Sequence, residues 1–71
     1  MKGIPSGYAA LFREFQPTHD PRHIEAYVRL QYGTLDHLTR DELRAEAEIG
    51  AACVDAHGVE HAEALAETYG L

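Results

Sequence analysis

The chain has 71 residues, of which 45% are hydrophobic, 8% aromatic and 25% charged. This length suits one small domain with a modest core, and the apolar content excludes a chain that is disordered throughout. The formal charge of -6 at pH 7 disfavours direct binding to nucleic acid or anionic lipid, because both carry negative charge themselves.

Apolar spacing predicts four helices, over residues 7–16, 21–32, 40–57 and 59–69, with a helical turn at 34–38. In the first helix, an aromatic face recurs at helical spacing, and the helix ends before Pro17, which disfavours helical geometry in the preceding residue. The second helix starts at Asp20-Pro21, because the Asp20 carboxylate can cap free backbone N–H groups and proline fits the first helical position. Gly33 supplies its stop.

The second helix has a predicted core stripe, with Glu25 and Arg29 paired one turn apart on its exposed side. Leu30 falls off this stripe, so we expect it either to be covered by another segment or to be exposed to a partner. The stripe consists of Ile24, Tyr27, Val28 and Tyr32.

The third helix has a clear start, because Thr39 and Glu42 have the spacing of a capping box. Gly58 separates it from the last helix. The inward face of the third helix is predicted to hold Leu43, Ala47, Gly50, Cys53, Val54 and His57. That of the last helix is predicted to hold Val59, Ala62, Leu65, Ala66 and Tyr69.

The pattern as a whole predicts an all-α fold, a small compact orthogonal bundle of about four short helices that forms a single domain over residues 1–71. Strand-like alternation is absent from the sequence. Its longest apolar runs are far shorter than the ~20 residues that cross a membrane. Cys53 is the only cysteine, which excludes an intrachain disulfide, and no secretion signal opens the chain. We therefore expect a soluble, cytoplasmic protein.

The negative charge is concentrated in residues 41–71, which hold eight carboxylates against one basic residue, Arg44. Such a surface is typical of a solvated face, and it is also suited to docking a basic partner. A helix-turn-helix interpretation fails because its recognition helix would carry acidic residues into a DNA groove. The residues that we expect to contact a partner are Asp41, Glu48, Asp55, Glu60, Glu63, Glu67 and, as an apolar contact, Leu30.

Histidines offer the alternative of a metal site. His19 and His23, like His57 and His61, have the four-residue spacing that aligns ligands on a helix. His19 precedes the Asp20 cap and Gly58 interrupts the second pair, so neither pair is expected to share a helical face. We therefore expect surface histidines and no cofactor, with His57 and His61 as the remaining candidate metal ligands.

Cys53 and His57 have the spacing of a nucleophile and its base, but catalysis also needs a concave pocket with an oxyanion site. A domain this small rarely forms such a pocket, and Cys53 lies on the predicted core face. We therefore expect no enzymatic activity.

Two segments, residues 15–20 (FQPTHD) and 32–38 (YGTLDHL), resemble short proteins encoded in bacterial genomes and their phages. The resemblance implies a bacterial or phage cytoplasmic origin and assigns no functional residue. The sequence thus favours a non-enzymatic, acidic helical interaction protein that binds a macromolecular partner, such as a basic nucleic-acid-binding protein. The alternatives are a small histidine-based metal-binding or enzymatic domain and a structural module that forms homo-oligomers.

Overall fold

Four helices make up most of residues 7–71, the part of the chain that the computed structural model describes. They are α1 (Gly7–Phe15), α2 (Pro21–Tyr32), α3 (Arg40–His57) and α4 (Val59–Thr68), and no strand occurs among the described residues. The predicted all-α bundle is therefore confirmed. The first six residues of the expected 1–71 domain lie outside the described residues.

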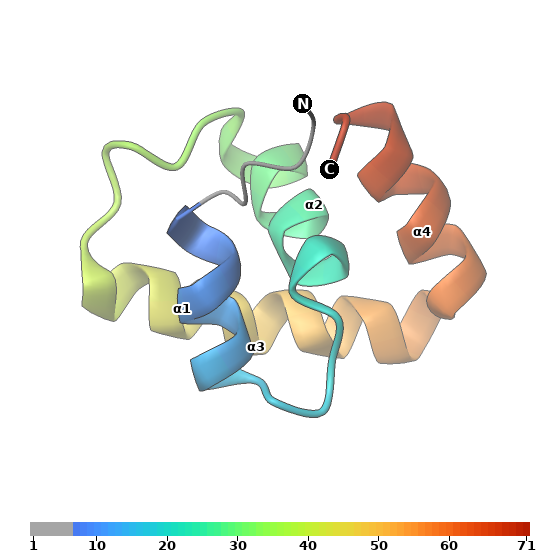
Figure 1. The fold of residues 1–71 in the computed structure, drawn as a ribbon, viewed down its shortest axis with the longest axis horizontal. Coiled ribbons are helices and arrows are strands. Elements are labelled where there is room, and N and C mark those ends of the chain that lie inside the picture. The colour runs from blue at the N-terminus through green and yellow to red at the C-terminus, as the bar shows by residue number, and fades with distance from the viewer. Residues whose placement is uncertain (1–6) are drawn as a thin grey trace.

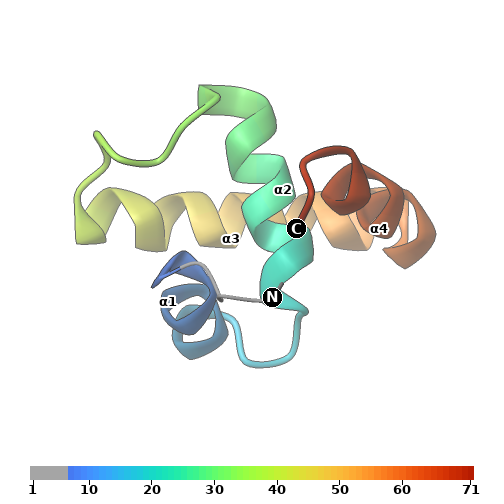
Figure 2. The same ribbon diagram turned by 45° about the horizontal axis from the view of Figure 1, so that its top comes forward.

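The arrangement of the helices is orthogonal (Figures 1 and 2). α3 runs along the longest axis of the molecule, and α1, α2 and α4 cross it steeply. α2 packs against all three other helices. Each helix contacts at least two others. The molecule measures 31 × 28 × 22 Å.

Both predicted helix starts are present. The Asp20 side chain accepts a hydrogen bond from the Arg22 backbone N–H at 2.9 Å, and Pro21 is the first residue of α2. At α3, the Thr39 hydroxyl accepts from the Glu42 N–H at 3.1 Å while the Glu42 carboxylate accepts from the Thr39 N–H at 2.8 Å. These local bonds satisfy backbone donors that a helix N-terminus leaves free.

The helix ends differ from the expected ones by a single residue at two places. α1 ends at Phe15 rather than at residue 16, and α4 ends at Thr68 rather than at residue 69. Gly33 and Gly58 have φ values of 81° and 96°, a region that favours glycine. Gly58 both ends α3 and begins α4, which produces a sharp corner between the two helices.

The core has two parts. The larger part is formed where α1, α2 and α3 meet, and the Leu35 side chain of the turn before α3 closes it with only 1% of its surface exposed. The smaller part lies between α2, the end of α3 and α4. The larger cluster consists of Phe12, Ile24, Val28, Leu35, Leu43, Ala47 and Ala51; the smaller one consists of Tyr27, Val54 and Ala62.

Several residues differ from the prediction in whether they are buried or exposed. The Glu25–Arg29 pair exists at 2.9 Å, but Glu25 is 2% exposed rather than on a solvent face, because neighbouring helices cover α2 on several sides. Tyr32 is at the surface, where its hydroxyl donates to Glu46 at 2.8 Å. Val59 and Tyr69 are exposed as well, since only one side of α4 packs against the bundle.

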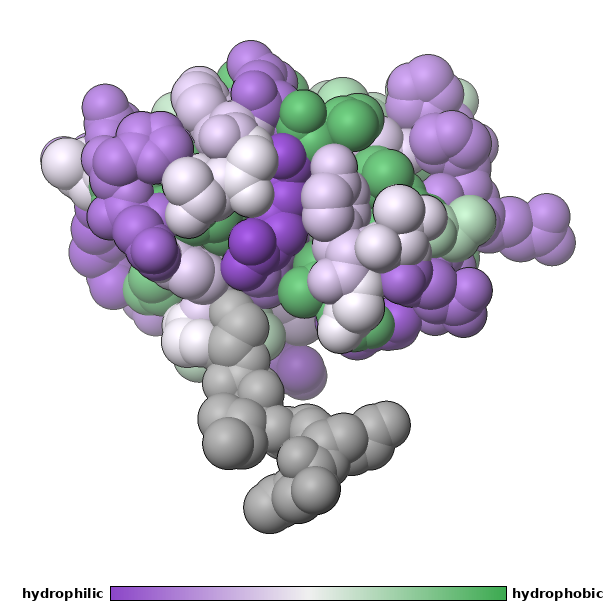
Figure 3. All heavy atoms as spheres, turned by 90° about the horizontal axis from the view of Figure 1, so that it is seen from above, coloured by the Kyte–Doolittle hydropathy of each residue, from purple (hydrophilic) through white to green (hydrophobic). Residues whose placement is uncertain are grey.

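On α3, the inward face differs from the predicted one at three positions. Ala51 is buried, Cys53 is half-buried and His57 is exposed. His57 is the last residue of α3, where the chain turns at Gly58. On the face seen in Figure 3, hydrophobic side chains reach the surface but hydrophilic ones separate them. None of the described helices has the length and apolar character needed to span a membrane.

Candidate functional site

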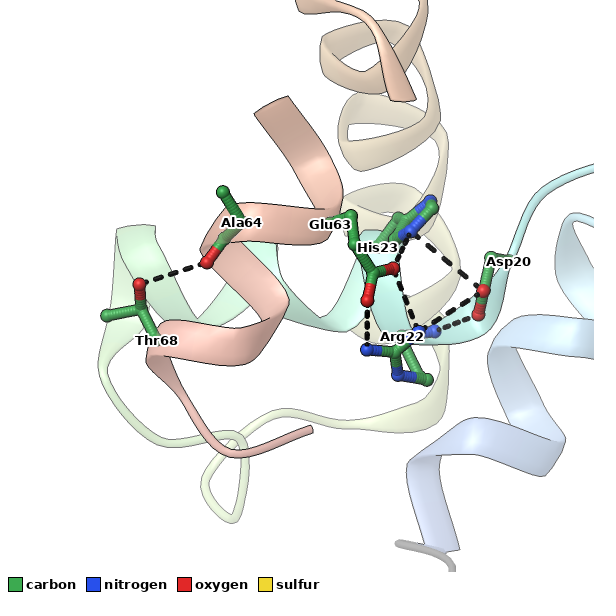
Figure 4. A network of polar contacts seen from close by, with 6 residues as sticks. All are labelled: Asp20, Arg22, His23, Glu63, Ala64 and Thr68. Atoms are coloured by element: carbon green, nitrogen blue, oxygen red, sulfur yellow. Dashed lines mark hydrogen bonds and ion pairs between the residues drawn. The ribbon is translucent and has the colours of Figure 1, made fainter. Parts of the chain in front are cut away.

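A polar network joins the start of α2 to α4 (Figure 4). The Arg22 guanidinium donates to both oxygens of the Glu63 carboxylate, at 2.9 and 2.8 Å. His23 Nε2 lies 2.8 Å from Glu63 Oε1 and 3.9 Å from Asp20 Oδ2. Arg22 is also 3.6 Å from Asp20. We call these four residues, Asp20, Arg22, His23 and Glu63, the α2–α4 network.

Three members of this network lie at the start of α2, and the fourth lies on α4. Asp20 is fixed as the cap of α2, and Arg22 and His23 follow in the first turn of that helix. Glu63 follows Ala62, which is fully buried, so its side chain projects from the edge of the α4 face that packs against α2. His23 is only 6% exposed, and its hydrogen bond to Glu63 satisfies a polar group that would otherwise be costly to bury.

The network changes the acidity of its members. Hydrogen bonds from Arg22 and then from His23 lower the pKa of Glu63 from 4.5 to about 2. The hydrogen bond between Arg22 and Glu63 also raises the pKa of Arg22. Glu63 is therefore a carboxylate at every physiological pH, and its charge faces Arg22 and His23.

A surface cavity of about 450 Å³ lies beside the network, between the residues before α2 and the α3–α4 corner. On its other side, His19 Nε2 lies 3.1 Å from Asp55 Oδ1. The cavity therefore has two histidines in its wall, each bonded to a carboxylate. Its lining consists of Thr18, His19, Asp20, His23, Val54, Asp55, Gly58 and Val59.

Metal-ligating side chains converge at the network. Asp20, His23 and Glu63 each place one ligand atom within 4.8 Å of the others. Imidazole and carboxylate are suitable ligands for divalent transition metals. Arg22 supplies positive charge between the two carboxylates, 3.6 Å from Asp20 and 2.8 Å from Glu63.

The candidate metal ligands His57 and His61 lie on different helices, α3 and α4, as the interruption at Gly58 predicts, but their rings are neighbours. Their ring centroids are 5.2 Å apart, because the corner at Gly58 turns α4 so that its first turn lies near the end of α3. The Tyr27 ring stacks near both, and its hydroxyl lies 2.8 Å from His61 Nδ1. Both histidines are exposed.

The predicted interaction residues fall into two groups. Asp41, Glu48, Glu60 and Glu67 are exposed, and none of them forms an ion pair with another residue of the described 7–71 region. We call these four carboxylates the acidic surface. Glu63 is different, because it is directed inward to Arg22, and Asp55 is partnered by His19. The apolar candidate, Leu30, is 59% exposed.

The arginines explain why this acidity is uncompensated. Arg22, Arg29 and Arg40 are paired with Glu63, Glu25 and Glu14. Arg40 and Arg44 also lie over the Phe15 ring, at 5.2 and 5.0 Å from its centroid, a favourable position for a cation. Most of the positive charge is thus used in contacts with α1, α2 and α4 rather than along the outer side of α3.

Sequence reasoning missed the α2–α4 network, although it identified Asp20 as a cap. His23 was expected at the surface, and Glu63 was placed among the exposed carboxylates. The available signal was the position of Glu63 next to Ala62, at the margin of the predicted inward face. Which side of that margin is covered depends on the approach of α2, and helical periodicity does not specify it.

Comparisons of the chain with protein-family models, with curated proteins and with solved structures found no match.

Proposed function

We propose that the protein is a non-enzymatic interaction protein whose acidic surface binds a basic macromolecular partner, such as a protein that itself binds nucleic acid. The observation that supports this function is the set of four exposed carboxylates on α3 and α4 without ion pairs among the described residues. Complementary charge on a partner would increase the rate of encounter and select against acidic competitors.

The positions of these carboxylates along α3 and α4 also suit a basic partner. Asp41 and Glu48 are seven residues apart on α3, and Glu60 and Glu67 are seven residues apart on α4. A separation of two helical turns places each pair on one side of its helix. Each helix therefore offers two carboxylates in one direction, a spacing that suits contact with an extended basic surface.

The test uses a labelled hexalysine peptide as a defined basic surface, with binding followed by fluorescence anisotropy in low salt. Asp41→Asn with Glu48→Gln, and separately Glu60→Gln with Glu67→Gln, remove the same amount of charge from α3 and from α4. We expect each pair to weaken binding by roughly two- to thirtyfold, the range for loss of two exposed charge contacts. Raising the ionic strength should weaken wild-type binding as well.

The control variant loses the same number of carboxylates from another part of the chain. Glu14 bonds to Arg40 and Asp36 accepts from Tyr8, so Glu14→Gln with Asp36→Asn removes two carboxylates outside the acidic surface. The proposal expects this variant to bind hexalysine nearly as well as the wild type. Equal losses in all three variants would show a response to net charge alone, and absence of wild-type binding at low salt would reject the function.

A further inference from the structure

We propose that Asp20, His23 and Glu63 form a binding site for a divalent transition-metal ion, and that zinc is the ion that this ligand set fits best. The three side chains come from two segments that are about forty positions apart in the sequence. They point toward one another in Figure 4 and lie at the edge of the surface cavity. This inference is independent of the acidic surface and of any partner.

The distances fit a small ion. His23 Nε2 is 2.8 Å from Glu63 Oε1 and 3.9 Å from Asp20 Oδ2, and all three ligand atoms lie within 4.8 Å of one another. Ligand atoms around tetrahedral zinc are about 3.3 Å apart, given bonds of about 2.0–2.1 Å. Changes of at most about 1.5 Å in the separations between the ligand atoms, through movement of the exposed Asp20 and the half-buried Glu63 side chains, would therefore complete the coordination.

His23 gives the site a fixed ligand. The residue is 6% exposed and lies in the first turn of α2, and its Nε2 atom is close to oxygens of both carboxylates. An imidazole with two carboxylates suits zinc, whereas magnesium prefers oxygen ligands alone. Three protein ligands leave a fourth position for water, and the adjacent cavity, with His19 and Asp55 in its wall, gives space for it.

Arg22 would compete with a metal ion for the Glu63 carboxylate. Its guanidinium bonds to both Glu63 oxygens. Binding of an ion at Oε1 would have to displace the Nη1 contact, and the nearby guanidinium charge would repel the cation. Arg22 is 37% exposed and can move away from Asp20. Removing this positive charge should therefore strengthen metal binding.

The experiment measures zinc affinity in tag-free protein by competition with a chromophoric chelator, with magnesium as the comparison ion. We expect one zinc ion per chain and no magnesium binding at the same concentrations. Asp20→Asn keeps an acceptable helix cap, and Glu63→Gln keeps the shape of the side chain. Each of them, and His23→Gln, should weaken zinc binding by at least about tenfold, the lower end for loss of even an outer-shell partner.

Two further variants distinguish this site from zinc binding elsewhere on the chain. His37→Gln, which removes an exposed histidine outside the network, should leave zinc affinity unchanged, and Arg22→Gln should raise it. Absence of wild-type zinc binding overturns the proposal. So does zinc binding that survives Asp20→Asn and Glu63→Gln but is lost when His57 and His61 are both replaced by Gln, since the ion would then bind at the α3–α4 corner. Unchanged or weakened affinity in a folded Arg22→Gln variant would count equally against it.

Discussion

The Glu63 side chain connects α4 to the start of α2. Its carboxylate accepts hydrogen bonds from Arg22 and lies 2.8 Å from His23, so α4 is held to the start of α2 by charge as well as by the small buried residues Ala62 and Ala66. A carboxylate with a lowered pKa in the folded state stabilises that state only while it is ionised. The contribution of Glu63 is therefore present above its unfolded pKa of 4.5 and is lost as the pH falls toward about 2.

This linkage predicts the behaviour of Glu63→Gln. At about pH 6 the variant should melt at a lower temperature than the wild type, and the difference should shrink steadily between about pH 4.5 and pH 2 as the wild-type carboxylate is protonated. Circular dichroism melts at a series of pH values, with a metal chelator present, measure it. Glu60→Gln is the matched control, because Glu60 is exposed and forms no ion pair with residues 7–71; it should not change this pH dependence. A Glu63→Gln deficit that is constant with pH would contradict the assignment.

The residues also show where prediction from the sequence succeeds and fails. Asp20, Thr39 and Gly58 were recognised because caps and stops act through bonds within a few residues. His23 and Glu63 were not, since their partners are about forty positions away and depend on how two helices approach each other. His57 and His61 were expected to share no helical face, and they do lie on two different helices, α3 and α4; the closeness of their rings across the corner at Gly58 was not foreseen.

Among the elements, the close crossing of α2 and α3 depends on one small residue, Gly50. A Cβ atom added at Gly50 would lie 3.2 Å from Ile24 Cγ2 and 3.3 Å from the Ile24 carbonyl oxygen. Ile24 is fully buried, and its backbone is part of α2, so neither atom can readily move away. Glycine in the middle of α3 costs helix propensity, and this approach explains why it is there.

Gly50→Ala should therefore destabilise the protein. The gain in helix propensity is about 1 kcal/mol, and overpacking at a buried crossing costs about 1–3 kcal/mol, so we expect a net loss of up to about 2 kcal/mol in urea unfolding. Ala52→Gly, on the exposed side of α3, provides the comparison, with a loss of about 1 kcal/mol from propensity alone. Stabilisation by Gly50→Ala would mean that α2 and α3 cross at a greater distance.

For the whole molecule, charge and apolar exposure act in opposite directions on self-association. Leu30, Ile49 and Val59 are 59%, 49% and 62% exposed, which could favour a second copy of the chain. The net charge of -6 opposes it, because two copies of the chain carry charge of the same sign and repel each other. On the face in Figure 3, moreover, hydrophilic side chains interrupt the apolar ones, whereas stable dimers usually bury a continuous apolar area.

We therefore expect the protein to remain a monomer with a mass near 7.9 kDa in light scattering coupled to size exclusion. Leu30→Ser should leave this mass unchanged at low salt and at about 0.5 M salt, where repulsion between exposed charges is largely screened. Because Leu30 is more than half exposed, the variant should also melt within a few degrees of the wild type. A dimer that appears as salt rises and dissociates in Leu30→Ser would instead make α2 a homo-oligomer interface. Salt-induced association of this kind is opposite in sign to the salt sensitivity expected for docking of a basic partner, so one salt series distinguishes the two.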